Sequence, residues 1–118
     1  MMKLVNARTQ QILVPRLEVA DTLWSCMRGL LGRSQLGAQE GLWIVSRGSI
    51  HTFFMKFAID LVFIDRDLVV TKTVSQVTPF RFVWRGWRAA SVIELQGGFL
   101  QRNPIRVGDK LHVDSSVS

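Results

Sequence analysis

The chain has 118 residues, of which 47% are hydrophobic and 20% charged, and a net charge of +6. This length fits a single domain, residues 1–118, with a core of its own, and the composition excludes a disordered chain. The excess of Lys and Arg favours anionic partners such as nucleic acid, acidic lipid or phosphorylated ligands. The plain alternative is a soluble protein that is merely basic.

The N-terminal region and the single cysteine bear on where the protein works. Cys26 is the only cysteine in the sequence, so it cannot form an intramolecular disulfide, and nothing indicates an oxidising compartment. The first twenty residues contain Lys3, Arg8 and Arg16 and no apolar core of signal-peptide length. The apolar run Leu61–Ile64 is far shorter than the roughly 20 residues that span a membrane. We therefore expect a cytoplasmic, soluble protein without a membrane span.

The first third of the chain predicts two strands followed by a helix. The strands are expected at Leu4–Ala7 and Gln11–Val19, and Pro15 indicates an edge or a bulge in the second. The helix is expected between an N-cap at position 21 or 22 and a stop at Gly32. One apolar helix face explains the spacing of Leu23, Trp24, Met27, Leu30 and Leu31.

The rest of the chain predicts short strands separated by turns. The expected strands are Leu42–Val45, Ile59–Asp65, Leu68–Val77, Ala90–Leu95 and Lys110–Val113. Asp65–Asp67 is expected as a hairpin turn, Gly97–Gly98 and Asn103–Pro104 as further turns, and residues 78–88 as a loop. Short strands at regular spacing with one helix indicate a mainly β domain, either a small barrel or a sandwich.

Four ordered blocks of sequence carry a resemblance to a known family. They are RGLLGR, HTFFMKFAIDLVFIDRDLVV, VIELQGG and VGDKL, and they resemble successive blocks of the domain-of-unknown-function 192 family from about Asn6 to Leu111. The resemblance implies a compact β-sandwich or jelly-roll-like barrel with one short helix near the N-terminus. It implies no activity, because the family has no established one. Some relatives carry a signal peptide, and this chain departs from them there.

His51, Asp60 and Glu94 are the candidate chemical residues. His51 and Asp60 belong to the densest apolar stretch of the chain, and a bend near Phe57 could bring them together. Glu94 lies in an apolar strand and is expected to be buried. A histidine with two carboxylates can perform acid–base chemistry or hold a metal. No metal-binding motif accompanies them, so no metal or other cofactor is assigned.

Structural roles are the competing explanation for these charged residues. A buried charge without a partner costs several kcal/mol in order of magnitude, so buried charges are usually paired. Asp60 can pair with Lys56, and Glu94 with Arg28, whose guanidinium can donate two parallel hydrogen bonds to a carboxylate. Arg28 is therefore expected in a structural ion pair, while Lys56 is also a candidate ligand-binding residue.

The segment PFRFVWRGWR, residues 79–88, alternates aromatic and basic residues and contains no acid. Such a segment can stack on bases and neutralise phosphates, insert at an anionic membrane surface or contact a protein. Alternatively, its tryptophans pack on the barrel and leave the arginines in solvent. The candidate partner-binding residues are Arg81, Trp84, Arg85, Trp87 and Arg88.

Two classes of function follow from these candidates. The first is a binding module that holds a protein or a small anionic ligand through a pocket near His51 and an exposed aromatic-basic loop; nucleic acid is the less favoured partner. The second is a small hydrolase-like enzyme that uses His51 with Asp60 and Glu94, with or without a metal. The binding module is preferred because an enzyme should show a sharper constellation of residues.

Overall fold

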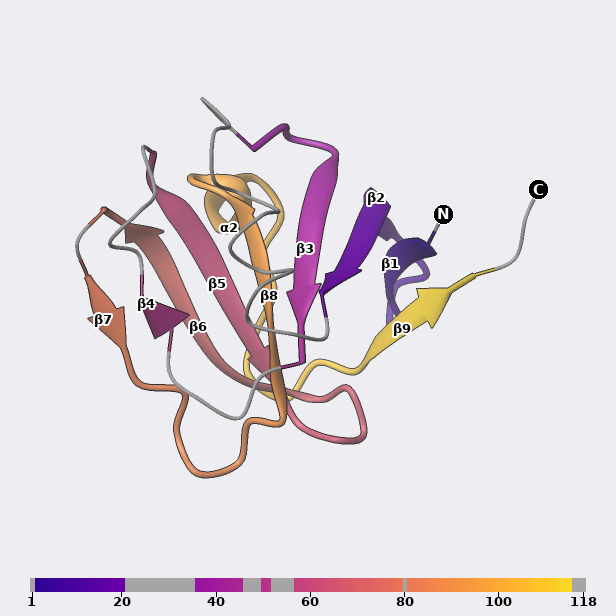
Figure 1. Ribbon diagram of the computed structural model, residues 1–118. Helices are drawn as coiled ribbons and strands as arrows, with labels where there is room; N and C mark the ends of the chain where they lie inside the picture. Colours follow the sequence, from indigo (N-terminus) through magenta and orange to yellow (C-terminus); the bar gives the residue numbers. More distant parts are fainter. Residues whose placement is uncertain (1, 21–35, 46–49, 52–56, 80, 116–118) are drawn as a thin grey trace.

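The computed structural model describes residues 2–20, 36–45, 50–51, 57–79 and 81–115 (Figure 1). The helix predicted after position 20, with Arg28 and Cys26, lies outside the described residues, and so does Lys56. The side chain of His51 is likewise not described.

Within the described residues the chain forms a seven-stranded sheet in the order β6-β5-β8-β3-β2-β1-β9. Neighbouring strands are antiparallel, apart from the parallel pair β2 and β3. The strands are β1 Met2–Asn6, β2 Ile12–Ala20, β3 Glu40–Ile44, β5 Ile59–Ile64, β6 Val70–Val77, β8 Ser91–Gln96 and β9 Leu111–Asp114. A small second sheet pairs β4, Ile50–His51, with β7, Phe82–Val83.

The large sheet curls into a half-barrel (Figure 1). Its two edge strands, β6 and β9, contact each other where each strand begins. Val69 forms an isolated bridge with Lys110, just before β6 and β9 begin. The Val70 amide donates to the Asp109 carbonyl at 2.9 Å, and the Leu111 amide donates to the Leu68 carbonyl at 2.9 Å. The right-handed twist of strands favours such coiling of a sheet.

Each face of the sheet carries its own hydrophobic cluster. The first cluster includes Val70 of β6 and Leu111 of β9, so it fills the inside of the curl, and α2, Phe99–Arg102, adds Phe99 to it. The second cluster covers the other face and includes Leu61 and Phe63 of β5. β5 is buried along its whole length, as its sequence predicts, since it is apolar on both faces apart from Asp60.

The mainly β, barrel-like fold predicted from the sequence is confirmed, with local differences. Of the two alternatives for Pro15, the edge strand is wrong, because β2 lies between β1 and β3, and the bulge agrees with the irregularity in the β1–β2 register at this residue. The turn at Gly97–Gly98 leads into α2, which the sequence did not indicate. Within the described residues, no helix is long and apolar enough to cross a membrane.

Candidate functional site

Asp60 is a fully buried carboxylate in β5 whose two oxygens both accept backbone hydrogen bonds. Its Oδ1 accepts from the amides of Gln76 at 2.8 Å and Gly98 at 3.2 Å, and its Oδ2 accepts from the amide of Leu100 at 2.8 Å. Gly98 is the N-cap of α2 and Leu100 is its second residue, and amides at the start of a helix have no partners inside it. Asp60 therefore fastens α2 and the irregular end of β6 to β5.

Glu94 is a buried carboxyl of a different kind. Its side chain lies in β8 and is 4% exposed, and its Oε2 has no hydrogen-bond partner among the described residues. Burial disfavours the charged form and raises the pKa of Glu94 from 4.5 to about 8. At neutral pH this carboxyl is therefore mostly protonated.

The structure does not bring Asp60 and Glu94 together. Asp60 pairs across the ladder with Leu95, and Glu94 pairs with Leu61. Directly opposed residues in an antiparallel pair share a face, and consecutive residues alternate between faces. The Asp60 side chain is therefore on the face of the first cluster and Glu94 on the face of the second. Among the described residues, no group of three His, Cys, Asp or Glu side chains can hold a metal ion.

The aromatic-basic loop, which we define as residues 81–88, is the most exposed aromatic feature of the described chain. The Trp87 side chain is 89% exposed and that of Trp84 is 48% exposed, and Phe82 is also exposed. The rings of Trp84 and Trp87 contact each other edge to face, with centroids 5.4 Å apart and planes at 88°. The expected alternative, in which the tryptophans pack on the barrel, is wrong for Trp87.

Two basic side chains, one from β6 and one from the loop itself, donate hydrogen bonds to backbone carbonyls of the loop and of the residue after it. Lys72 Nζ donates to the Trp84 carbonyl at 2.8 Å and lies 5.9 Å from the centroid of the Phe63 ring. Arg85 Nη1 donates to the Ala89 carbonyl at 2.6 Å. The other two basic residues of the loop, Arg81 and Arg88, are exposed. Arg81 Nε donates to Thr78 Oγ1 at 3.3 Å.

His51 belongs to the backbone that adjoins this loop. In the small second sheet, His51 is the register partner of Phe82 and Ile50 that of Val83. The region around His51 and the aromatic-basic loop, which the sequence treats as separate candidates, therefore share one short ladder.

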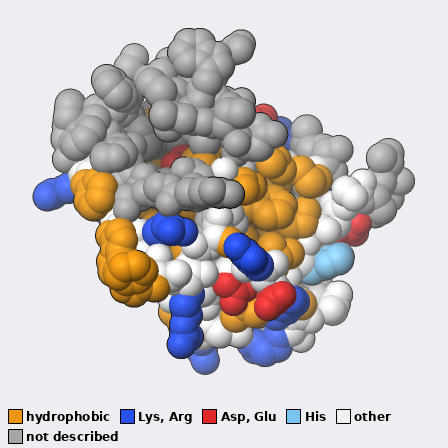
Figure 2. All heavy atoms as spheres, turned by 60° about the horizontal axis from the view of Figure 1, so that its bottom comes forward, with side chains coloured by type: hydrophobic (Ala, Val, Ile, Leu, Met, Phe, Trp, Pro, Cys, Tyr) orange, Lys and Arg blue, Asp and Glu red, His pale blue; other side chains and the backbone are white. Residues whose placement is uncertain are grey.

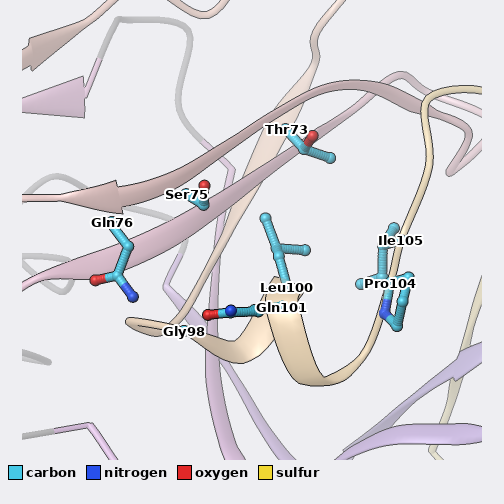
Figure 3. A pocket seen from close by; sticks show the side chains of 8 residues that line it. All are labelled: Thr73, Ser75, Gln76, Gly98, Leu100, Gln101, Pro104 and Ile105. Atoms are coloured by element: carbon cyan, nitrogen blue, oxygen red, sulfur yellow. The ribbon is translucent and has the colours of Figure 1, made fainter.

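A cavity of about 380 Å³ lies between β6 and α2 (Figure 3). The residues that line it are uncharged, and many have polar side chains. They are Thr73, Ser75, Gln76, Gly98, Leu100, Gln101, Pro104 and Ile105. Sequence reasoning missed this cavity. A four-residue helix is too short to show a 3.6-residue period, so nothing in the sequence pattern placed α2 beside β6.

Comparisons with known proteins place the chain in an uncharacterised group. A curated UPF0127 protein from Thermococcus sibiricus is 27% identical over 112 residues, which cover 92% of this chain and 72% of that protein. A protein of unknown function from Novosphingobium aromaticivorans has a similar structure, with a TM-score of 0.78 and 21% identity over 94% of this chain and 82% of that one. A candidate transcription regulator from Sinorhizobium meliloti 1021 gives a TM-score of 0.77 and 19% identity, over 95% of this chain and 91% of that one.

These structural likenesses establish a shared fold. The family assignment comes from the sequence, because residues 4–113 match the family model DUF192, described as "Uncharacterized ACR, COG1430". That match spans nearly the whole chain and agrees with the resemblance of its four sequence blocks. The chain belongs to the DUF192 family.

Proposed function

We propose that the protein is a non-enzymatic binding module that holds an anionic partner through its aromatic-basic loop. The observation that carries this proposal is the exposure of Trp87, whose side chain is 89% accessible to solvent. Tryptophan is highly buried on average, and it is enriched among the residues that dominate binding energies. An indole left in water beside a second exposed indole is therefore best explained by a partner that covers it.

The charge of the loop supports an anionic partner. Residues 79–88 contain Arg81, Arg85 and Arg88 and no acidic residue, and the whole chain carries +6. Lys72 adds a further cation at the base of the loop. A cluster of one sign attracts and orients an oppositely charged partner during encounter.

The competing proposal is a hydrolase-like enzyme that uses His51, Asp60 and Glu94. One observation favours it, since a buried carboxyl with a pKa raised to about 8 is suited to donate a proton near neutral pH. Two observations weigh against it. Both oxygens of Asp60 are occupied by backbone amides, and Asp60 and Glu94 face opposite sides of the sheet.

An amide-resolved NMR titration distinguishes the two proposals. The folded protein is titrated separately with a short single-stranded oligonucleotide, with vesicles containing phosphatidylglycerol and with zinc. A binding module predicts signal changes confined to residues 81–88 with at least one anionic probe, and their loss in Trp87→Ser. Changes centred on Glu94 with zinc would favour the enzyme, and no loop response to either anionic probe would refute the binding module.

A further inference from the structure

We infer that the partner of the aromatic-basic loop is the surface of an anionic lipid bilayer, into whose headgroup region Trp87 and Trp84 insert. This inference rests on the proposed function and names the class of partner. Tryptophan is enriched at membrane–water interfaces, where its apolar ring and its polar N–H are both accommodated.

The position of the loop suits contact with a surface. The chain from β7 to β8 descends below the rest of the sheet in Figure 1, so the loop forms an extremity of the molecule in that view. Figure 2, which brings this end forward, shows hydrophobic side chains at one edge of the face with Lys and Arg side chains close by. A projecting aromatic tip can enter a soft interface without a matching groove in the partner.

The ring geometry favours lipid over single-stranded nucleic acid. Proteins that hold single strands offer aromatic faces on which successive bases stack. The rings of Trp84 and Trp87 are 88° apart, with the edge of one directed at the face of the other. They therefore offer no common stacking platform. A bilayer interface does not require stacked rings, because each indole only has to reach the depth of the interface.

The hydrogen bonds donated by Lys72 and Arg85 lower the free-energy cost of taking the loop backbone out of water. A carbonyl that leaves water without a partner is strongly disfavoured in a low-dielectric medium. The carbonyls of Trp84 and Ala89 already accept hydrogen bonds from Lys72 and Arg85. These cations also stay close to the loop, where they can attract anionic headgroups.

The exposure of the aromatic side chains limits how deeply the loop can insert into the bilayer. Trp87 is almost fully exposed, whereas Trp84 and Phe82, the second of which belongs to the small second sheet, are each only about half exposed (48% and 58%). We therefore expect peripheral, reversible and salt-sensitive binding. The indoles supply apolar contact and the cations select anionic lipid.

Vesicle sedimentation tests the inference. The full chain is mixed with vesicles of phosphatidylcholine, alone or with about a quarter phosphatidylglycerol, at low and high salt. We expect pelleting with the anionic vesicles at low salt and a blue shift of tryptophan emission on binding. Trp87→Ser should weaken binding at least about tenfold, because it removes a large apolar side chain from the interface. Arg88→Gln should weaken binding about fivefold.

Matched variants control for general loss of apolar surface or charge. Ile12→Ser removes an exposed hydrophobic side chain from β2, and Arg16→Gln removes an exposed cation from the same strand. Both should bind anionic vesicles within about twofold of the wild type, since neither belongs to the loop. Equal losses in the controls and the loop variants would overturn the inference.

The remaining outcomes separate the two proposals. If single-stranded DNA binds in a Trp87-dependent manner and vesicles do not, the lipid inference fails and the binding module stands. Equal binding to neutral and anionic vesicles would also overturn the inference, because charge would then select nothing. If neither vesicles nor DNA bind, both the inference and the proposed function fail.

Discussion

Asp60 and Glu94 lie on adjacent strands of one sheet, yet their side chains leave it on opposite faces. The register sets this arrangement, because Asp60 opposes Leu95 while Glu94 opposes Leu61. Asp60 is held by three backbone amides, whereas Oε2 of Glu94 has no partner among the described residues. One carboxylate therefore holds local structure together, and the other is a buried titrating group.

Glu94 should make the protein less stable as the pH rises. Its pKa is raised from 4.5 to about 8 in the folded state, so the folded protein binds the proton more tightly than the unfolded chain. This contribution to stability is complete below pH 4.5 and is lost as the pH rises towards about 8, by at most about 1.4 kcal/mol per pH unit. Urea denaturation of the wild type and Glu94→Gln across this range measures the effect.

The difference between these two proteins isolates Glu94 from other titrating groups. Glu94→Gln should gain stability relative to the wild type between pH 5 and 8, because glutamine cannot ionise. An ion pair with Arg28, the structural role expected from the sequence, predicts the opposite. Glu94 would then be charged in the folded protein, and Glu94→Gln would be destabilised most at neutral pH.

Replacing Asp60 should destabilise the fold strongly. Asp60→Asn keeps the size of the side chain but puts an NH₂ group where one oxygen accepts backbone amides. The cost should be about 2–4 kcal/mol, since it combines loss of charge-assisted hydrogen bonds with an unsatisfied buried donor. Chemical denaturation measures it, and Asp67→Asn at an exposed position is the control. A cost below about 0.5 kcal/mol, the usual size for surface changes, would contradict this role.

The elements that local pattern determines were predictable from the sequence. Apart from Asp60, β5 is an apolar run that ends at a turn of charged residues, and the Leu68 amide donates to the Asp65 carbonyl as that hairpin requires. β8 has Val92, Ile93 and Leu95 around Glu94 and ends at two glycines. Such segments carry their own start and stop signals, so their existence and approximate bounds follow from a single sequence.

The candidate site was less predictable because it depends on non-local register. Whether Asp60 and Glu94 share a face is decided by how β5 and β8 align, and residues 34 positions apart in sequence carry no local mark of that alignment. For a similar reason, the sequence could not decide whether the Trp87 side chain is exposed or buried. An alternating aromatic-basic segment has the same sequence whether its rings pack on the barrel or face solvent.

Trp87 should matter for binding and not for folding. Its side chain is 89% exposed, so Trp87→Ser should change the free energy of unfolding by no more than about 0.5 kcal/mol. Phe99→Ala, which removes a buried ring of α2 from the first cluster, should cost about 3–5 kcal/mol. Thermal and urea denaturation compare the two variants. A loss above about 1 kcal/mol in Trp87→Ser would assign Trp87 to the core.

Lys72 should hold the aromatic-basic loop in its conformation. Lys72→Met keeps a long apolar side chain near Phe63 but removes the donor to the Trp84 carbonyl and one positive charge. We expect faster amide exchange in residues 84–88 and an indole pair with lower order parameters, while the sheet retains its protection. Native-state hydrogen exchange and indole relaxation measure both effects. Lys72→Arg, which can still donate to the carbonyl, should restore most of the protection. If Lys72→Met leaves exchange in the loop unchanged, the conformation of the loop is determined by Arg85 and Ala89 alone.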